Sequence, residues 1–214
     1  AEDDELEIPF GPGAPTARGS RMRVPLPVVG CSEQEVNSIR GIGDQFALKT
    51  KHHDTGLHSR YAPQGGPAEE MFEWIEEARI ASIGSLYMEG VAQNLDARLE
   101  TQCQQAAFDS ITAETDAPLS VAVGLLVRQE LTGRELPPSA ENVVRFWREH
   151  VEAHAGAQIR ALKGHIKDQA EFATKCRSII ADLGLAADLD DPSEGEHNQD
   201  ELETMDENQD AESD

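Results

Sequence analysis

From residue 32 to residue 183 the apolar side chains recur every three or four positions, which is the spacing of one face of an α-helix. The alternation of apolar and polar residues that a half-buried β-strand requires is nearly absent after residue 30. Several such helices bury their apolar stripes by packing against one another. The sequence therefore predicts an all-α helical bundle, in which the stripes form an ordinary core rather than a cofactor pocket.

Capping and helix-breaking residues divide this part of the chain into separate helices. Ser32 followed by Glu35 is typical of a capping box. Pro118 and Gly133 favour the start and the stop of a later helix, and Ser139 is predicted to cap the next one. The predicted helices hold, in order, Val36, Ile39, Ile42 or Gly43 and Phe46; Phe72, Ile75, Arg79 and Ile83, from about Ala68; Met88, Val91, Leu95 and Leu99, after a pause at Gly84; Val143, Phe146, Trp147 and Val151; and, in one last helix over about 157–183, Ile159, Leu162, Ile166, Phe172, Cys176, Ile179 and Leu183.

The two ends of the chain differ from its helical middle. Residues 1–30 contain five prolines and four glycines, a density that excludes a helix and favours extended backbone. Two short alternations there, at residues 6–8 and 22–24, are candidate edge strands that could pair as a β-hairpin. We expect a helical domain over residues 31–186 and an acidic tail over residues 187–214.

The charge of the chain is concentrated in that tail. The net charge is −23, and residues 188–214 carry thirteen acidic residues and no lysine or arginine. Such a segment buries too little apolar surface to offset its chain entropy, so we expect it to be disordered. The overall excess of acids argues against binding nucleic acid or an anionic membrane surface.

The expected cellular location follows from the membrane-span, signal-peptide and disulfide patterns that the sequence lacks. No apolar run approaches the 18 or so residues of a membrane span, and no signal-peptide pattern opens the chain. The three cysteines (Cys31, Cys103 and Cys176) are far apart and form no zinc-ribbon or disulfide framework. We therefore expect a cytoplasmic protein.

Nucleotide-binding and protease-like motifs are not found. The sequence has no P-loop, and Gly41-Ile42-Gly43 lacks the third glycine of a dinucleotide-binding turn. His150 and His154 are four residues apart, but Val151 stands where a zinc protease has its glutamate, and no third ligand is nearby. We interpret this histidine pair as part of a solvated helix face.

A second group of polar residues leaves several interpretations open. His52, His53, Asp54 and His58 lie close in sequence, and Asp54 is spaced to orient His58. They suit a structural network at a helix end, a contact with a partner, or a transition-metal site. Arg79 falls on an apolar stripe, where an arginine reaches the surface or pairs with a buried acid such as Asp44 or Glu76.

We assign no catalytic, cofactor-binding or metal-binding residue, and we single out one candidate interaction or structural polar cluster. Its members are Arg40, Asp44, His53, Asp54, His58 and Arg79.

An ordered set of short strings resembles one known family. The strings are Leu6-Glu7-Ile8 with Phe10, Arg40-Gly41-Ile42-Gly43-Asp44, His53-Asp54, Ala62-Pro63-Gln64-Gly65, Met88-Glu89-Gly90-Val91-Ala92-Gln93-Asn94-Leu95, Asp116-Ala117-Pro118-Leu119, Leu131-Thr132-Gly133, Trp147-Arg148 and Asp168-Gln169. Together they resemble the amino-terminal region, with the acidic segment that follows it, of the T subunit of the aerobic cobaltochelatase.

The resemblance implies a role in a multisubunit enzyme that inserts Co²⁺ into hydrogenobyrinic acid a,c-diamide during cobalamin biosynthesis. The complex uses ATP, Mg²⁺ and Co²⁺, whereas this chain would bind no cofactor and be inactive alone. Its implied partners are a AAA+ ATPase subunit and a large corrin-binding subunit. The family also has a von Willebrand A-type domain with a D-x-S-x-S metal site, which this sequence lacks, so we expect a truncated form or a fragment.

Two other functions compete with this interpretation. One is a stand-alone acidic helical adaptor with no enzymatic role, whose tail recruits basic proteins. The other is a metallohydrolase that uses the histidines between residues 52 and 58.

Overall fold

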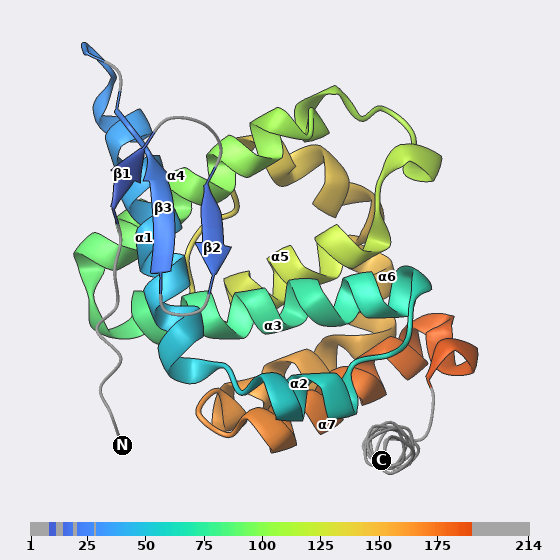
Figure 1. Ribbon diagram of the computed structural model, residues 1–214. Helices are drawn as coiled ribbons and strands as arrows, with labels where there is room; N and C mark the ends of the chain where they lie inside the picture. Colours follow the sequence, from blue (N-terminus) through green and yellow to red (C-terminus); the bar gives the residue numbers. More distant parts are fainter. Residues whose placement is uncertain (1–8, 12–14, 19–20, 28, 190–214) are drawn as a thin grey trace, which may run out of the picture.

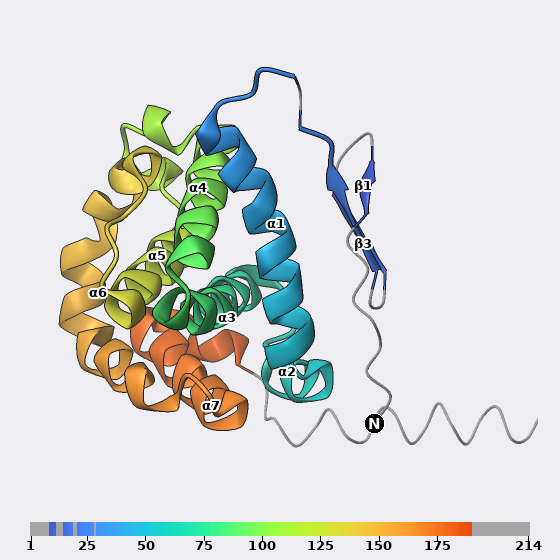
Figure 2. The ribbon, with the colours of Figure 1, turned by 90° about the vertical axis from the view of Figure 1, so that its left-hand side faces the viewer.

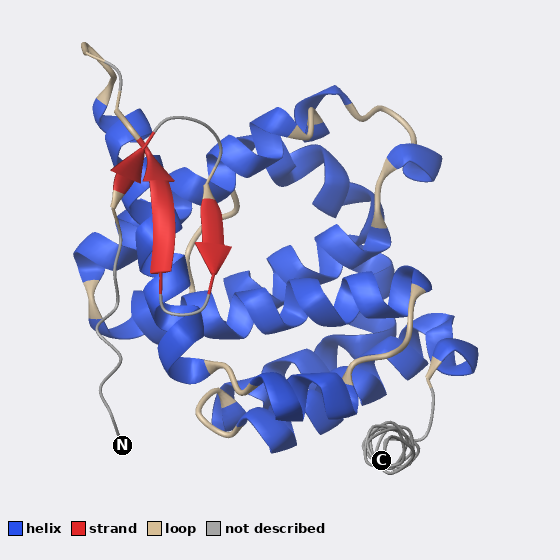
Figure 3. Ribbon diagram, in the orientation of Figure 1, coloured by secondary structure: helices blue, strands red, loops and turns tan. Residues whose placement is uncertain are grey.

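The computed structural model describes residues 9–11, 15–18, 21–27 and 29–189 (Figure 1). The candidate strand at residues 6–8 and the acidic tail from residue 190 lie outside these ranges. The described part is helical from residue 33 to its end, with three short strands before it (Figure 3). The predicted all-α fold is therefore confirmed.

The helices are α1 (Glu33–His52), α2 (Thr55–Tyr61), α3 (Gly66–Tyr87), α4 (Glu89–Gln105), α5 (Leu119–Thr132), α6 (Glu141–Ala161) and α7 (Gln169–Ile180), with short helical turns η1 (Phe108–Ser110), η2 (Glu114–Asp116), η3 (Pro138–Ala140), η4 (Leu162–His165), η5 (Ala181–Leu185) and η6 (Ala186–Asp188).

Helix α3 is the centre of the bundle. It is in contact with α1, α4, α5 and α7, and the other helices surround it in Figure 2. Its predicted stripe is buried, with Phe72, Ile75 and Ile83 all less than a tenth exposed. Met71 and Ile80, on other sides of the same helix, are fully buried too. A helix that is buried on several sides belongs in the middle of a fold, and α3 occupies that place.

Three of the predicted helix starts and stops are confirmed. Ser32 and Glu35 form the capping box: the Ser32 hydroxyl accepts from the Glu35 N–H, and the Glu35 carboxylate accepts from the Ser32 N–H. Pro118 precedes α5, and Gly133 ends it in the left-handed conformation that glycine adopts without steric cost. Because the capping box, Pro118 and Gly133 act on their own neighbours in the sequence, these boundaries could be predicted without information on packing.

Two predicted boundaries are wrong because tertiary contacts override the local signal. Ser139 does not cap α6; its hydroxyl donates to Glu100 Oε1 over 2.6 Å and so ties turn η3 to α4. Gly84 does not interrupt α3, which continues to Tyr87. A Cβ on Gly84 would lie 2.5 Å from Leu48 Cδ1, so this glycine allows a close approach of α1 instead of a break.

The predicted last helix is also wrong as a single element. Helix α6 ends at Ala161, and turn η4 separates it from α7. Asp168 caps α7, since its Oδ1 accepts from the Glu171 N–H over 3.1 Å. The apolar spacing runs unbroken through Leu162 and Ile166, which are both buried. The turn therefore keeps the periodicity of a helix while changing the direction of the chain.

The amino-terminal segment forms a small sheet beside α1. Strand β3 (Arg21–Pro25) lies between β1 (Phe10–Gly11), to which it is parallel, and β2 (Thr16–Arg18), to which it is antiparallel (Figure 1). The predicted strand at residues 22–24 is thus found, but it is the central strand of the sheet and not an edge strand, and its hairpin partner is β2. Val24 of β3 is 2% exposed, and β3 contacts α1. Among the described residues no helix is long and apolar enough to cross a membrane.

A glycine of α1, and not the apolar stripe predicted for that helix, forms the close contact between α1 and α4. Val36, Ile39 and Phe46 of that stripe are only partly buried. The buried face of α1 is instead Ser38, Gly41, Gly43, Gln45 and Leu48. A Cβ on Gly41 would lie 2.2 Å from the backbone oxygen of Asn94 in α4. The two backbones approach so closely that only glycine fits at this position.

Replacing this glycine tests the close approach. We expect Gly41→Ala to lower the free energy of unfolding by about 1–3 kcal/mol, because α1 and α4 must move apart. Gly90→Ala is the control: Gly90 is an exposed helical glycine, a Cβ added to it would meet nothing within 4 Å, and alanine there should raise stability by about 0.5–1 kcal/mol. Equal effects of the two substitutions in a denaturant titration would contradict the packing described.

Candidate functional site

A buried ion pair on α3 forms the centre of the polar cluster. Arg79 is 1% exposed and Glu76 5% exposed. Arg79 donates from Nε to Glu76 Oε2 and from Nη2 to Glu76 Oε1, both over 2.7 Å. The two residues are three apart on one helix, which brings the guanidinium and the carboxylate side by side. The predicted pairing of Arg79 with a buried acid is thus found, and its partner is Glu76.

The remaining donors of Arg79 reach the backbone of two other segments. Nη2 donates to the carbonyl of His52, in the last turn of α1, over 2.8 Å, and Nη1 donates to the carbonyl of Ile166, after η4, over 3.0 Å. Carbonyls at helix ends have no partner within their own helix and carry partial negative charge. One guanidinium therefore joins α3 to the end of α1 and to the turn before α7.

Gln169 and Asp54 complete this junction. The side-chain amide of Gln169 donates to the Asp54 carbonyl over 2.9 Å, and its oxygen accepts from the Asp54 N–H over 2.7 Å. The Asp54 carboxylate caps α2, since Oδ1 accepts from the Leu57 N–H. The first residue of α7 thus holds the linker between α1 and α2 in place.

Two histidines lie against this junction, each paired with a carboxylate of α3. His53 Nδ1 is 2.8 Å from Glu76 Oε1, and His58 Nε2 is 2.5 Å from Glu73 Oε1. The two imidazole rings are 4.7 Å apart. His58 Nδ1 is buried and has no hydrogen-bond partner. The result is a row of two imidazoles between two acids: Glu73, His58, His53 and Glu76.

The carboxylates in this row are held in their charged form. Burial raises the pKa of Glu76, but the hydrogen bonds from Arg79 and His53 outweigh it, and the net pKa lies below its usual value. The pKa of Glu73 is lowered mainly by its hydrogen bond with His58. The cluster therefore contains two charged carboxylates beside one buried guanidinium.

The structure brings together four of the six residues singled out from the sequence. His53, Asp54, His58 and Arg79 lie in or beside this junction, whereas Asp44 accepts from Asn94 Nδ2 over 2.8 Å on α4. Arg40 is exposed. A contact of these residues with a partner stays a prediction.

Two proposed pairings are wrong. Asp54 does not orient His58, because its carboxylate caps α2, and Asp44 is not the partner of Arg79. Glu73 and Gln169 were not anticipated from the sequence, because they are polar residues with no unusual spacing. For Glu73, the one available signal was its position three residues before Glu76, the acid considered as a partner of Arg79.

The other histidine pair and the thiols do not add to the site. His150 and His154 are exposed on α6, and His154 Nδ1 donates to the His150 carbonyl, so the predicted solvated face is found. Burial raises the pKa of Cys103 to about 12 and that of Cys176 well above its usual value. Both thiols are therefore protonated near neutral pH, and a protonated thiol is a poor nucleophile.

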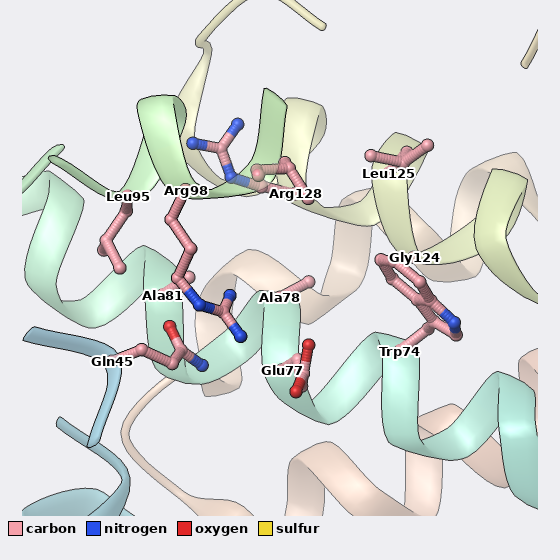
Figure 4. Close-up of a pocket in the computed structure, with 11 residues that line it drawn as sticks. Gln45, Trp74, Glu77, Ala78, Ala81, Leu95, Arg98, Gly124, Leu125 and Arg128 are labelled. Atoms are coloured by element: carbon pink, nitrogen blue, oxygen red, sulfur yellow. The ribbon is translucent and has the colours of Figure 1, made fainter. Parts of the chain in front are cut away.

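A small cavity lies on the other side of α3 (Figure 4). Its walls come from α1, α3, α4 and α5, and Figure 4 shows Arg98 between Gln45 and Glu77. Its volume is about 30 Å³, and the buried Gln45 Oε1 has no hydrogen-bond partner. A cavity of this size is far too small for a nucleotide or a tetrapyrrole.

The importance of the buried ion pair can be tested by removing the guanidinium. We expect Arg79→Met to lower the free energy of unfolding by about 3–5 kcal/mol, because the buried charge of Glu76 would lose the guanidinium that offsets it. The control is Arg160→Met, which removes an exposed ion pair with Glu152 and should cost at most about 1 kcal/mol. Urea titrations of both variants measure the difference. Similar decreases in the free energy of unfolding would show that the buried ion pair contributes no more to stability than the exposed one.

Comparison with known proteins agrees with the resemblance seen in the sequence strings. The model of the family described as "Cobalamin biosynthesis protein CobT" matches residues 1–214. No solved structure matches the chain. Because the family match extends over the whole sequence, the chain belongs to the CobT family of cobalamin biosynthesis proteins, which are subunits of the aerobic cobaltochelatase.

Proposed function

We propose that this chain is the assembly part of an ATP-dependent cobaltochelatase that inserts cobalt into hydrogenobyrinic acid a,c-diamide. In this proposal it docks to a AAA+ ATPase subunit and to a large corrin-binding subunit, and does no chemistry of its own. The observation that carries the proposal is the match of the CobT family over residues 1–214.

The chemistry of the chain supports a docking role. The sequence contains no P-loop, so ATP hydrolysis is assigned to a partner. The cavity between α1, α3, α4 and α5 cannot hold a corrin, and the thiols of Cys103 and Cys176 are buried and protonated. The described residues form a packed helical body with two larger open hollows, of about 550 and 410 Å³, at its surface.

The junction at Arg79 supports the same role in a different way. It fixes the end of α1, the start of α2 and the start of α7 relative to α3. A surface whose elements are already fixed loses less conformational entropy when a partner binds. The body is therefore preorganised for docking.

Reconstitution with purified subunits tests the proposal. We expect the 214-residue chain to co-elute with the AAA+ subunit in size-exclusion chromatography, and to insert no cobalt when the ATPase and the corrin-binding subunit are absent. Cobalt insertion by the chain alone, or no association with the ATPase at any concentration tested, would contradict it.

A salt series separates this function from that of an acidic adaptor. Binding through the acidic tail alone would weaken steeply with salt and would extend to unrelated basic proteins. We expect the complex with the ATPase to persist at about 0.3 M salt, where a basic control protein such as egg-white lysozyme has dissociated from the chain. Equal loss of both partners would favour the adaptor.

A further inference from the structure

Three potential metal ligands meet beside the Arg79 junction. His53 follows α1, His58 belongs to α2, and Glu76 belongs to α3. One ligand atom from each lies within 4.8 Å of the others. These residues come from three segments, so their convergence depends on the folded junction and not on a sequence motif. Imidazole nitrogen and carboxylate oxygen are the donors found in catalytic zinc sites.

His58 is oriented as a metal-binding histidine usually is. Its Nε2 is 2.5 Å from Glu73 Oε1, and because a carboxylate accepts, Nε2 carries the proton. In its neutral form such a ring has its lone pair on Nδ1, and this atom is buried without a partner. A carboxylate that accepts from one ring nitrogen while the other binds the ion is a recurrent arrangement at metal sites. An unpartnered buried nitrogen otherwise costs stability.

The other two ligands are held in place by their neighbours. The side chains of His53 and Glu76 are 4% and 7% exposed, and His53 Nδ1 donates to Glu76 Oε1 over 2.8 Å, a hydrogen bond that a bound ion would replace with release of the Nδ1 proton. Two hydrogen bonds from Arg79 fix the Glu76 carboxylate. The guanidinium repels a cation, but Glu73 and Glu76 together place two negative charges against that one positive charge. The side chain of Glu73 is 44% exposed, which gives the site an edge open to solvent.

We propose that His53, His58 and Glu76 bind a divalent transition-metal ion such as Zn²⁺ or Co²⁺, and that Glu73 orients His58. Two nitrogen ligands and one oxygen ligand suit these ions and discriminate against Mg²⁺ and Ca²⁺, which prefer oxygen ligands alone. A further coordination position is left for water. No metal ligand was assigned here from the sequence, because neither Glu73 nor Glu76 is close to the histidines along the chain. The site is inferred independently of the proposed function.

Titration of the full chain with Co²⁺ tests the site, since the visible absorption of Co²⁺ intensifies when it leaves six-coordinate water for a four- or five-coordinate site. A large excess of Mg²⁺ occupies the acidic tail, whose carboxylates are hard oxygen ligands. We expect one equivalent of Co²⁺ to develop the intense bands in the wild type. We expect His58→Ala to abolish them and His154→Ala, the control on α6, to leave them unchanged.

A milder variant tests the site even if His58→Ala disrupts the fold. Glu73→Gln keeps all three ligands and removes the carboxylate that orients His58, so we expect one equivalent to bind about 10- to 100-fold more weakly. Far-ultraviolet circular dichroism of the metal-free variants reports whether the helices persist. Unchanged Co²⁺ affinity in both His58→Ala and Glu73→Gln, or no intense band in the wild type, would overturn the proposal.

Discussion

The hydrogen bonds of Arg79 are the interaction on which the rest of the described structure depends. A guanidinium that is 1% exposed has lost its hydration, and only neighbouring acceptors can offset that loss. Glu76 supplies the charge, and the carbonyls of His52 and Ile166 supply two further acceptors. These carbonyls are themselves groups that helix ends leave unpaired. The buried cation and the helix ends therefore satisfy one another, which explains why three segments far apart in sequence meet here.

The same junction creates the chemistry of the histidines. Glu76 accepts from Arg79 and lies 2.8 Å from His53, so one carboxylate belongs both to the structural ion pair and to the proposed metal site. Gln169 holds the backbone at Asp54, and that linker carries His53 on one side and α2 with His58 on the other. Binding of an ion at the histidines would consequently be coupled to the positions of α1, α2 and α7. In the docking role proposed above, such coupling would connect metal occupancy to the shape of the docking surface.

The sequence predicted those parts of the fold that local chemistry determines. The capping box at Ser32 and the stop at Gly133 need only their own neighbours, and Arg79 was recognisable because an arginine on an apolar stripe requires a partner. The turn at residues 162–168 was missed because its apolar residues keep helical spacing. The pairing of His58 with Glu73 joins residues fifteen apart on two helices, and the hydrogen bonds of Gln169 join residues 115 apart. No local pattern contains that information.

Native-state hydrogen exchange in Arg79→Met is the most direct test that this arginine joins the three segments. The amides to follow are those of His53, which closes α1 by donating to Lys49, and of Phe172, which opens α7 by donating to Asp168. Gly133, which closes α5 by donating to Gln129, is the reference. If Arg79 joins the segments, protection at His53 and Phe172 falls together, and further than at Gly133. An equal fall at all three amides, or a fall at only one end of the junction, would contradict that role.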